Sequence, residues 1–155
     1  MYNIKNHRLE WKIISDSAGL WATNGYLFCY NYIAEYCKIL YYKDAGTNGA
    51  AGNIDNKVNE LINTCNLISV KARTFTGDVM DERTINLLWE VVDDNGMKHY
   101  FDSKLIGWLL YRLNKLDYKP ITYKIDPEKK VLLFEFDGDI VGGVIGLNMT
   151  EEDLS

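Results

Sequence analysis

Apolar and polar residues alternate in short runs through the first third of the chain, and this spacing is typical of β-strands. The runs cover residues 9–15, 20–23 and 26–31. Asn24-Gly25 lies between the second and third runs and predicts a two-residue type I′ turn, in which both residues have positive φ. These features predict a β-rich N-terminal segment over residues 1–50.

The stretch that follows, residues 32–42, fits two patterns. Ile33, Cys37 and Leu40 recur at helical spacing, whereas the alternating aromatic residues that begin at Tyr26 continue to Tyr32 as they would in a strand. Of the two, we favour the strand.

A segment rich in glycine, asparagine and alanine, residues 44–53, separates this region from a more regular pattern. After it, one amphipathic helix precedes three strands, and the same order repeats with helix starts about 50 residues apart. The expected elements are helix 54–66 with strands 67–76, 84–94 and 97–102, then helix 103–116 with strands 121–126, 131–136 and 140–149. They predict an α+β fold in which two αβββ repeats, within residues 54–149, place both helices on one face of antiparallel strands.

Composition indicates a soluble, globular protein. The 155 residues have the size of one domain, 47% of them are hydrophobic, and no apolar run has the length that a bilayer requires. We therefore expect an intracellular, cytoplasmic location. The three cysteines have neither the number nor the spacing of a disulfide framework or a zinc site, and we expect free thiols. The net charge of −5 argues against a surface that is basic all round, but it is compatible with one basic face.

Three stretches resemble the domain of DNA sliding clamps, above all the bacterial β clamp, the β subunit of DNA polymerase III. LWATNGYLF, residues 20–28, is similar to the strand, turn and strand around ATDG in that family, with Asn24 in place of the usual aspartate. HYFDSKLIGWLLYRL, residues 99–113, resembles the phenylalanine and leucine-rich helix that open the second half of a clamp domain. Residues 121–149 resemble the closing three strands, which end here in LNM rather than near Met-Pro-Met.

The resemblance implies a clamp-like fold whose helices line a hole and face DNA. A bacterial clamp subunit has three such domains, whereas this chain has one and an N-terminal extension, so a ring would need several copies. Residues 1–50 would suit the remnant of a second domain.

The helix predicted over residues 103–116 carries the most informative polar residues. Its apolar arc contains Leu105, Ile106, Leu109, Leu110 and Leu113, and its cations lie on a separate arc of roughly 80° if the helical turn reaches Lys119. Aromatic residues border this basic stripe, which suits contact with phosphates without regard to base sequence. The predicted DNA-binding residues are Lys104, Trp108, Arg112, Lys115 and Lys119. An ordinary solvated face would look the same, and the other helix offers only Lys57 as a cation.

Enzyme chemistry has little support in the sequence. His7 and His99 are the only histidines, and no nucleophile elbow, phosphate loop or metal-spaced His/Cys set occurs. Loop carboxylates could hold Mg²⁺; they are Asp78, Asp81, Glu82, Asp93 and Asp94. Aspartates are also common in turns without any function, and we favour that explanation. We expect no enzymatic activity, cofactor or metal.

Two hypotheses about function follow. The first is a non-enzymatic, clamp-like protein that associates with double-stranded DNA or the replication machinery as a homo-oligomer, with a virus or mobile element as one source that we consider. The second is a small interaction or inhibitor protein of the same fold, which binds a partner protein through its aromatic N-terminal third.

Overall fold

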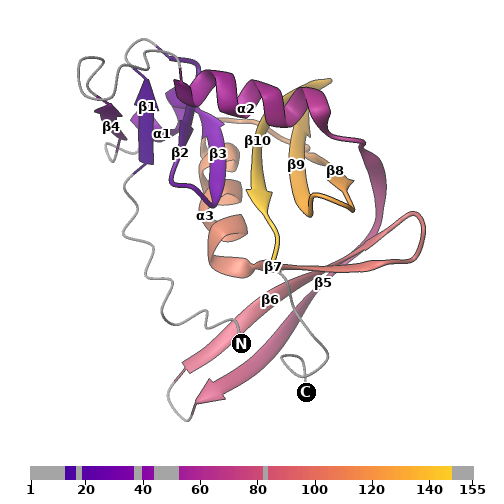
Figure 1. Cartoon of the computed structure of the whole chain (residues 1–155). Coiled ribbons are helices and arrows are strands. Elements are labelled where there is room, and N and C mark those ends of the chain that lie inside the picture. The colour runs from indigo at the N-terminus through magenta and orange to yellow at the C-terminus, as the bar shows by residue number, and fades with distance from the viewer. Residues whose placement is uncertain (1–12, 17–18, 37–39, 44–52, 82–83, 148–155) are drawn as a thin grey trace.

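Ten strands form one continuous sheet in this computed structural model, which describes residues 13–16, 19–36, 40–43, 53–81 and 84–147 (Figure 1). The strands are β1 (Ile13–Asp16), β2 (Trp21–Thr23), β3 (Leu27–Tyr30), β4 (Leu40–Lys43), β5 (Ile68–Asp81), β6 (Thr84–Asp93), β7 (Lys98–Asp102), β8 (Thr122–Asp126), β9 (Val131–Phe136) and β10 (Asp139–Ile145). The helices are α1 (Asn31–Tyr36), α2 (Asn53–Thr64) and α3 (Ser103–Lys115).

The order of the strands across the sheet is β4-β1-β2-β3-β10-β9-β8-β5-β6-β7. Neighbouring strands are antiparallel except for β4, which pairs in parallel with β1 at one end. Three helices pack on this sheet, so the predicted α+β class is confirmed. In the part of the chain that the structure describes, no helix is long and apolar enough to cross a membrane.

From α2 onward, the chain forms one helix and three strands and then the same order again, as the sequence pattern predicts. The first strands of the two groups, β5 and β8, pair with each other, and the other strands follow outward in matching order on either side. β10 then pairs with β3, so the N-terminal strands extend the same sheet. Residues 44–52 of the predicted linker and the ends of two predicted strands, residues 9–12 and 148–149, lie outside the described residues, whereas Asn53 begins α2.

The prediction that both helices lie on one face of the sheet is wrong. Val131 and Leu133 of β9 pack in one cluster with the apolar side of α2, whereas Leu132 and Phe134 pack in the other cluster with α3. Successive side chains of a strand point to opposite faces, so the two helices cover opposite faces. Figure 1 shows α2 in front of the strands and α3 behind β10.

The preference for a strand over residues 32–42 is correct only at its end, because residues 31–36 form α1 and the strand β4 begins at Leu40. β3 ends at Tyr30, where the backbone N–H of Asn31 donates to the carbonyl of Leu20 at 2.7 Å and its side-chain amide donates to that of Gly19 at 3.0 Å. The helical turn then places Ile33 and Ala34 in the core with no exposed surface. Burial of two adjacent side chains therefore outweighs the local alternation of aromatic residues.

The β2–β3 hairpin exists as predicted, but its turn is not of type I′. Gly25 has a φ of 91°, whereas Asn24 does not have positive φ, and the pairing of Thr23 with Phe28 centres the turn on Gly25 and Tyr26. The Asn24 side-chain oxygen accepts hydrogen bonds from the backbone N–H groups of Tyr26 and Leu27, both at 2.9 Å. This side-chain turn replaces the backbone bond that a type I′ turn would use.

Replacement of Gly25 by alanine should lower the free energy of unfolding by about 1 kcal/mol, because alanine resists the positive φ at this position. A side chain there would meet nothing within 4 Å, so backbone strain is the only expected cost. Urea unfolding of the Gly25→Ala variant measures the difference. An unchanged unfolding midpoint would show that the turn tolerates alanine.

Two glycines of β10 make room for side chains on the two faces of the sheet. A Cβ added at Gly142 would lie 3.0 Å from Cδ2 of Leu109 in α3, and one added at Gly143 would lie 2.5 Å from Cζ of the Phe28 ring. The glycine pair in the sequence thus has a packing role. Gly107, in contrast, lies on the exposed side of α3 with nothing within 4 Å of its added Cβ.

Alanine should have opposite effects on stability at the crowded Gly143 and at the exposed Gly107. Gly143→Ala should destabilise the protein by roughly 1–3 kcal/mol, because the buried Phe28 ring must move. Gly107→Ala should stabilise it by up to about 1 kcal/mol, because alanine favours the helical backbone. Thermal unfolding of both variants tests this, and a stabilised Gly143→Ala protein would contradict the packing of β3 on β10.

Candidate nucleic-acid interface

Helix α3 packs one side on the sheet and exposes the other. Its N-terminus is capped by Asp102, whose Oδ1 accepts a hydrogen bond from the backbone N–H of Lys104 at 2.9 Å. The predicted apolar arc is confirmed, since four of its five residues are buried in the core and Leu110 packs at its edge; the four are Leu105, Ile106, Leu109 and Leu113. The cations of the helix therefore face outward.

Arg112 and Trp108 form a stacked pair on this outer side. The Arg112 guanidinium carbon lies 4.2 Å from the centre of the Trp108 ring, and Nη1 donates to the Trp108 carbonyl at 3.1 Å. Trp108 is 8% exposed, so most of the ring is covered and it supports the guanidinium from below. Of this predicted pair, only the half-exposed Arg112 is placed for direct contact with a ligand.

Tyr111 adds an aromatic surface beside the cations. Its side chain is 59% exposed, with Lys115 Nζ 5.5 Å and the Arg112 guanidinium 5.7 Å from the ring centre. Arg112 and Lys115 lie in the last turn of α3, where cations also stabilise the helix dipole. Lys104 lies in the first turn, where a cation opposes the dipole, so helix stability does not explain its position.

Lys119 is not part of the helical stripe, contrary to the prediction. The helix ends at Lys115, and the chain then reverses at Asp117, which has a φ of 62°. Lys119 carries an exposed and distant ion pair with Asp117, at 3.9 Å, and lines a pocket beside the end of the helix. The stripe therefore contains three cations, Lys104, Arg112 and Lys115, and the fourth belongs to a different feature.

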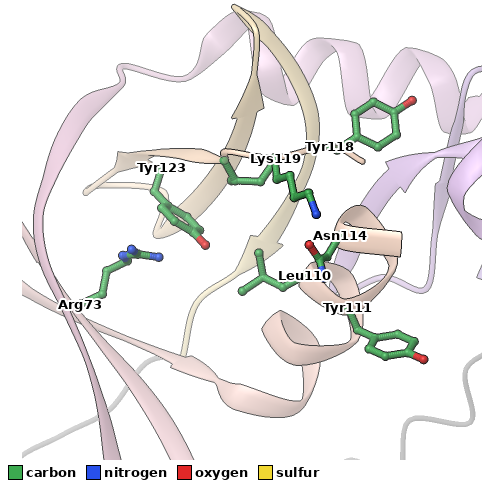
Figure 2. Close-up of a pocket in the computed structure, with 8 residues that line it drawn as sticks. Arg73, Leu110, Tyr111, Asn114, Tyr118, Lys119 and Tyr123 are labelled. Carbon is green, nitrogen blue, oxygen red and sulfur yellow. The ribbon is translucent and has the colours of Figure 1, made fainter. Parts of the chain in front are cut away.

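This pocket, called here the tyrosine pocket, has a volume of about 430 Å³ and lies between α3, the segment after it, β5 and β8 (Figure 2). Its lining consists of three tyrosines, two cations, one amide and two aliphatic residues: Tyr111, Tyr118, Tyr123, Arg73, Lys119, Asn114, Leu110 and Ile121. No carboxylate lines it among the described residues. Figure 2 shows Arg73 and Tyr123 facing each other across from α3, with Lys119 above Leu110 and Asn114.

Arg73 is the functional candidate that sequence reasoning missed. Its guanidinium carbon lies 4.1 Å from the centre of the Tyr123 ring and 5.6 Å from that of Trp89. Burial raises the pKa of the Tyr123 hydroxyl, and the positive charge of Arg73 opposes that increase. Arg73 reaches the pocket because β5 pairs with β8, and no local pattern in the sequence reveals this pairing.

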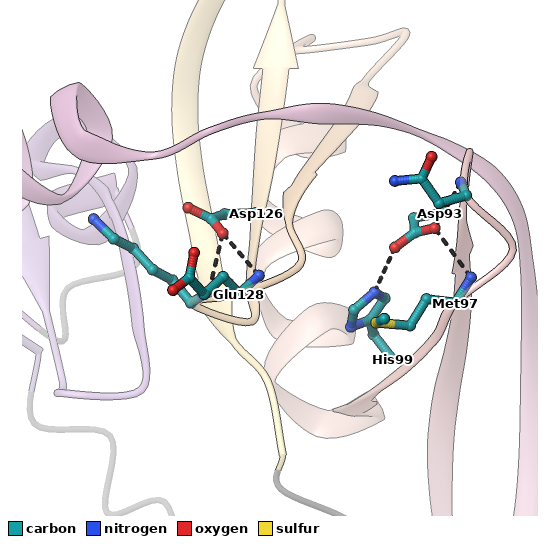
Figure 3. Close-up of polar contacts among 7 residues, drawn as sticks. Asp93, Met97, His99, Asp126 and Glu128 are labelled. Atoms are coloured by element: carbon teal, nitrogen blue, oxygen red, sulfur yellow. Dashed lines mark hydrogen bonds and ion pairs between the residues drawn. The ribbon is translucent and has the colours of Figure 1, made fainter.

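His99 is not placed for catalysis. Its Nε2 lies 2.8 Å from Oδ2 of Asp93, and the two side chains are only 2% and 1% exposed (Figure 3). The other Asp93 oxygen accepts from the backbone N–H groups of Asn95 and Met97, at 2.8 and 3.1 Å, within the turn between β6 and β7. A buried pair that holds a turn has no access to a substrate.

Of the predicted carboxylate candidates, the structure describes the side chains of Asp93 and Asp94, and Asp93 holds the turn between β6 and β7. Asp78, Asp81 and Glu82 lie outside the described side chains or residues. No group of three or more His, Cys, Asp or Glu side chains among the described residues could hold a metal ion. Cys29 and Cys65 are free thiols, and Cys37 lies outside the described residues.

Asp126 holds the turn between β8 and β9 in the same manner as Asp93 (Figure 3). Its Oδ1 accepts from the backbone N–H groups of Glu128 and Lys129, each at 2.9 Å, and Oδ2 accepts from that of Asn66 at 3.0 Å. Burial disfavours the charged carboxylate, but these hydrogen bonds outweigh burial and lower the pKa of Asp126. The pKa of Asp93 is lowered in the same way, by His99 and two backbone N–H groups.

These two aspartates should make the protein lose stability in acid. Because their native pKa lies below the ordinary value near 3.9, the unfolded chain takes up protons first as the pH falls. Their contribution to the free energy of unfolding should be complete above about pH 4 and should disappear as the pH falls through their native pKa. Urea unfolding between about pH 6 and pH 2.5 should show this decline. The double variant Asp93→Asn, Asp126→Asn should have a lower free energy of unfolding at pH 6 and should lose less of it as the pH falls. Equal losses in wild type and the variant would contradict the assignment.

On the opposite side of the sheet, an apolar groove lies between α2 and the β2–β3 hairpin. Its volume is about 700 Å³, and its apolar lining includes Ile14, Leu27, Phe28, Ile54, Val58 and Ile145. This groove is in the region that the second hypothesis assigns to a partner protein.

Comparison with known proteins finds no matching family model, no matching curated protein and no matching solved structure. The interface is therefore interpreted from its own chemistry.

Proposed function

We propose that this protein is a non-enzymatic, clamp-like protein that associates with double-stranded DNA through the outer side of α3. The observation that carries the proposal is the row of Lys104, Arg112 and Lys115 along that side, with Arg112 held on Trp108. Such cations displace counterions from the phosphate backbone and bind without reading bases.

The order of elements supports a likeness to clamp domains. Two groups of one helix and three strands follow each other, and their first strands pair at the centre with the others in matching order outward. The net charge of −5 is compatible with one basic face on an acidic protein. Four aspartates are buried or partly buried with hydrogen-bond partners inside the fold: Asp16, Asp55, Asp93 and Asp126.

The placement of the helices limits the likeness. Because α2 and α3 cover opposite faces, only one of them can face a given duplex. α2 carries a single cation, Lys57, and its Asn59 already accepts a hydrogen bond from Trp21 Nε1 at 2.9 Å. We therefore assign the DNA contact to α3 alone, one helix per copy.

One chain of this size cannot encircle a duplex, so a ring would require several copies. The outer strands of the described sheet are β4 and β7, and edge strands are where further strands can add. Without such assembly, the contact with DNA would be open and weak.

The affinity for a duplex should be independent of base sequence and should fall steeply with salt. Each lost phosphate contact should reduce the log-log salt slope by roughly 0.9. The test compares wild type with Lys104→Gln, Arg112→Gln, Lys115→Gln across a salt series, using fluorescence anisotropy and native mass. Glutamine suits the half-buried Arg112 better than glutamate does, since it does not place a new charge beside Trp108.

Lys57→Gln is the matched control, because Lys57 is an exposed helical cation on the opposite face. It should bind as wild type does. A triple variant with wild-type affinity, or a protein without affinity for DNA at low salt, would overturn the proposal. The second result in a monomer would favour the partner-protein hypothesis, in which the aromatic N-terminal third binds a partner. That segment lines part of the apolar groove beside α2.

A further inference from the structure

The tyrosine pocket adjoins the basic stripe and shares Tyr111 with it. Arg112 and Lys115 of the stripe lie over the Tyr111 ring, which also lines the pocket. A phosphate backbone that follows the stripe toward the end of α3 therefore arrives at the pocket. The volume of about 430 Å³ is within the usual range of small-ligand sites, roughly 300–1,000 Å³.

Two of the tyrosine rings have orientations that the core determines. Tyr118 packs edge-on against Phe136, with ring centres 5.3 Å apart, and Tyr123 packs edge-on against Phe134 at 5.1 Å. Rings that are held in this way need little ordering when a planar group stacks on them. The aromatic walls of the pocket are thus in place before a ligand binds.

The charge of the pocket is positive and uncompensated by its own lining. Arg73 and Lys119 come from different segments and line it together, and no carboxylate does so among the described residues. Asn114 adds an amide that can both donate and accept hydrogen bonds. Aromatic walls, two cations and an amide match the chemistry of one nucleotide, with a planar base and a phosphate.

A base within a duplex is stacked between its neighbours and cannot enter such a pocket. We infer that the tyrosine pocket binds one unstacked nucleotide of a single DNA strand, next to the strand segment that contacts the stripe on α3. The inference rests on the proposed DNA contact and adds a preference for single-stranded over double-stranded DNA. The stripe binds phosphates of either form, whereas the pocket distinguishes the two.

The test measures the affinity of the whole protein for labelled oligo(dT), for the same oligonucleotide with abasic sites, and for a duplex of equal length. Tyr123→Leu removes a pocket ring that is not part of the stripe, and Arg73→Gln removes a pocket cation. Each should weaken binding to oligo(dT) about tenfold and leave duplex binding unchanged. Abasic oligonucleotide should bind wild type as weakly as oligo(dT) binds Tyr123→Leu.

Matched controls lie elsewhere on the chain. Tyr26→Ala removes an exposed tyrosine of the β2–β3 turn, and Lys57→Gln removes an exposed cation of α2; neither residue lines the pocket. Both should bind oligo(dT) as wild type does. Tyr118→Leu offers a second ring variant, and thermal unfolding of both ring variants shows whether any loss of binding reflects loss of fold.

The outcomes separate this inference from the proposed function. Pocket variants that bind oligo(dT) like wild type, while the stripe variant loses duplex binding, would overturn the pocket alone. Equal competition by polyglutamate of matched charge would show that the pocket binds an acidic chain rather than a base, and would also overturn it. Free thymidine monophosphate that competes as well as oligo(dT) would assign the site to a free nucleotide instead of a strand. Absence of binding to every oligonucleotide would overturn both.

Discussion

β9 buries four consecutive side chains, and this double burial determines how the rest of the sheet must be covered. Val131 is 3% exposed, and Leu132, Leu133 and Phe134 have no exposed surface. Because a strand directs alternate side chains to opposite faces, a run of this kind is stable only where both faces are shielded from water. Each buried side chain contributes roughly 1.5–3 kcal/mol, so a bare face would be costly. α2 shields one face and α3 shields the other.

The candidate interface follows from this arrangement. α3 must present its leucines to the sheet, so its cations point away from it. The pairing of β5 with β8 then brings Arg73 beside Tyr123, next to the end of α3. The pocket cations Arg73 and Lys119 thus adjoin the cations of α3 through Tyr111. Several carboxylates accept hydrogen bonds inside the fold. Asp16 accepts from backbone N–H groups in the first turn of α2, and Asp55 accepts from the backbone N–H groups of Leu20 and Trp21.

The hairpin at residues 20–28 is held by a side-chain acceptor that either asparagine or aspartate could supply. Asn24 takes part through its side-chain oxygen, which accepts from two backbone N–H groups, and an aspartate offers the same acceptor. Thr23 assists, because its hydroxyl donates to the Leu27 carbonyl at 2.7 Å and accepts from the Gly25 N–H at 3.0 Å. This position requires a side-chain oxygen that reaches the backbone N–H groups of Tyr26 and Leu27, and Asn and Asp both provide one.

The order of elements from α2 to β10, the turns between them and the two sides of α3 follow from the sequence alone. They depend on interactions between residues close in the chain: periodic apolar positions, capping by Asp102, and turn residues such as Gly96 and Gly138. The continuous apolar run at Val131 to Phe134 was also a local signal that both faces are buried, and it was overlooked in the prediction of one helical layer. The tertiary fold settles which face each helix covers, that residues 31–36 form a helix, and that Lys119 leaves the stripe to join Arg73 in a pocket. Those outcomes depend on contacts between segments far apart in the chain, whose burial outweighs local preference.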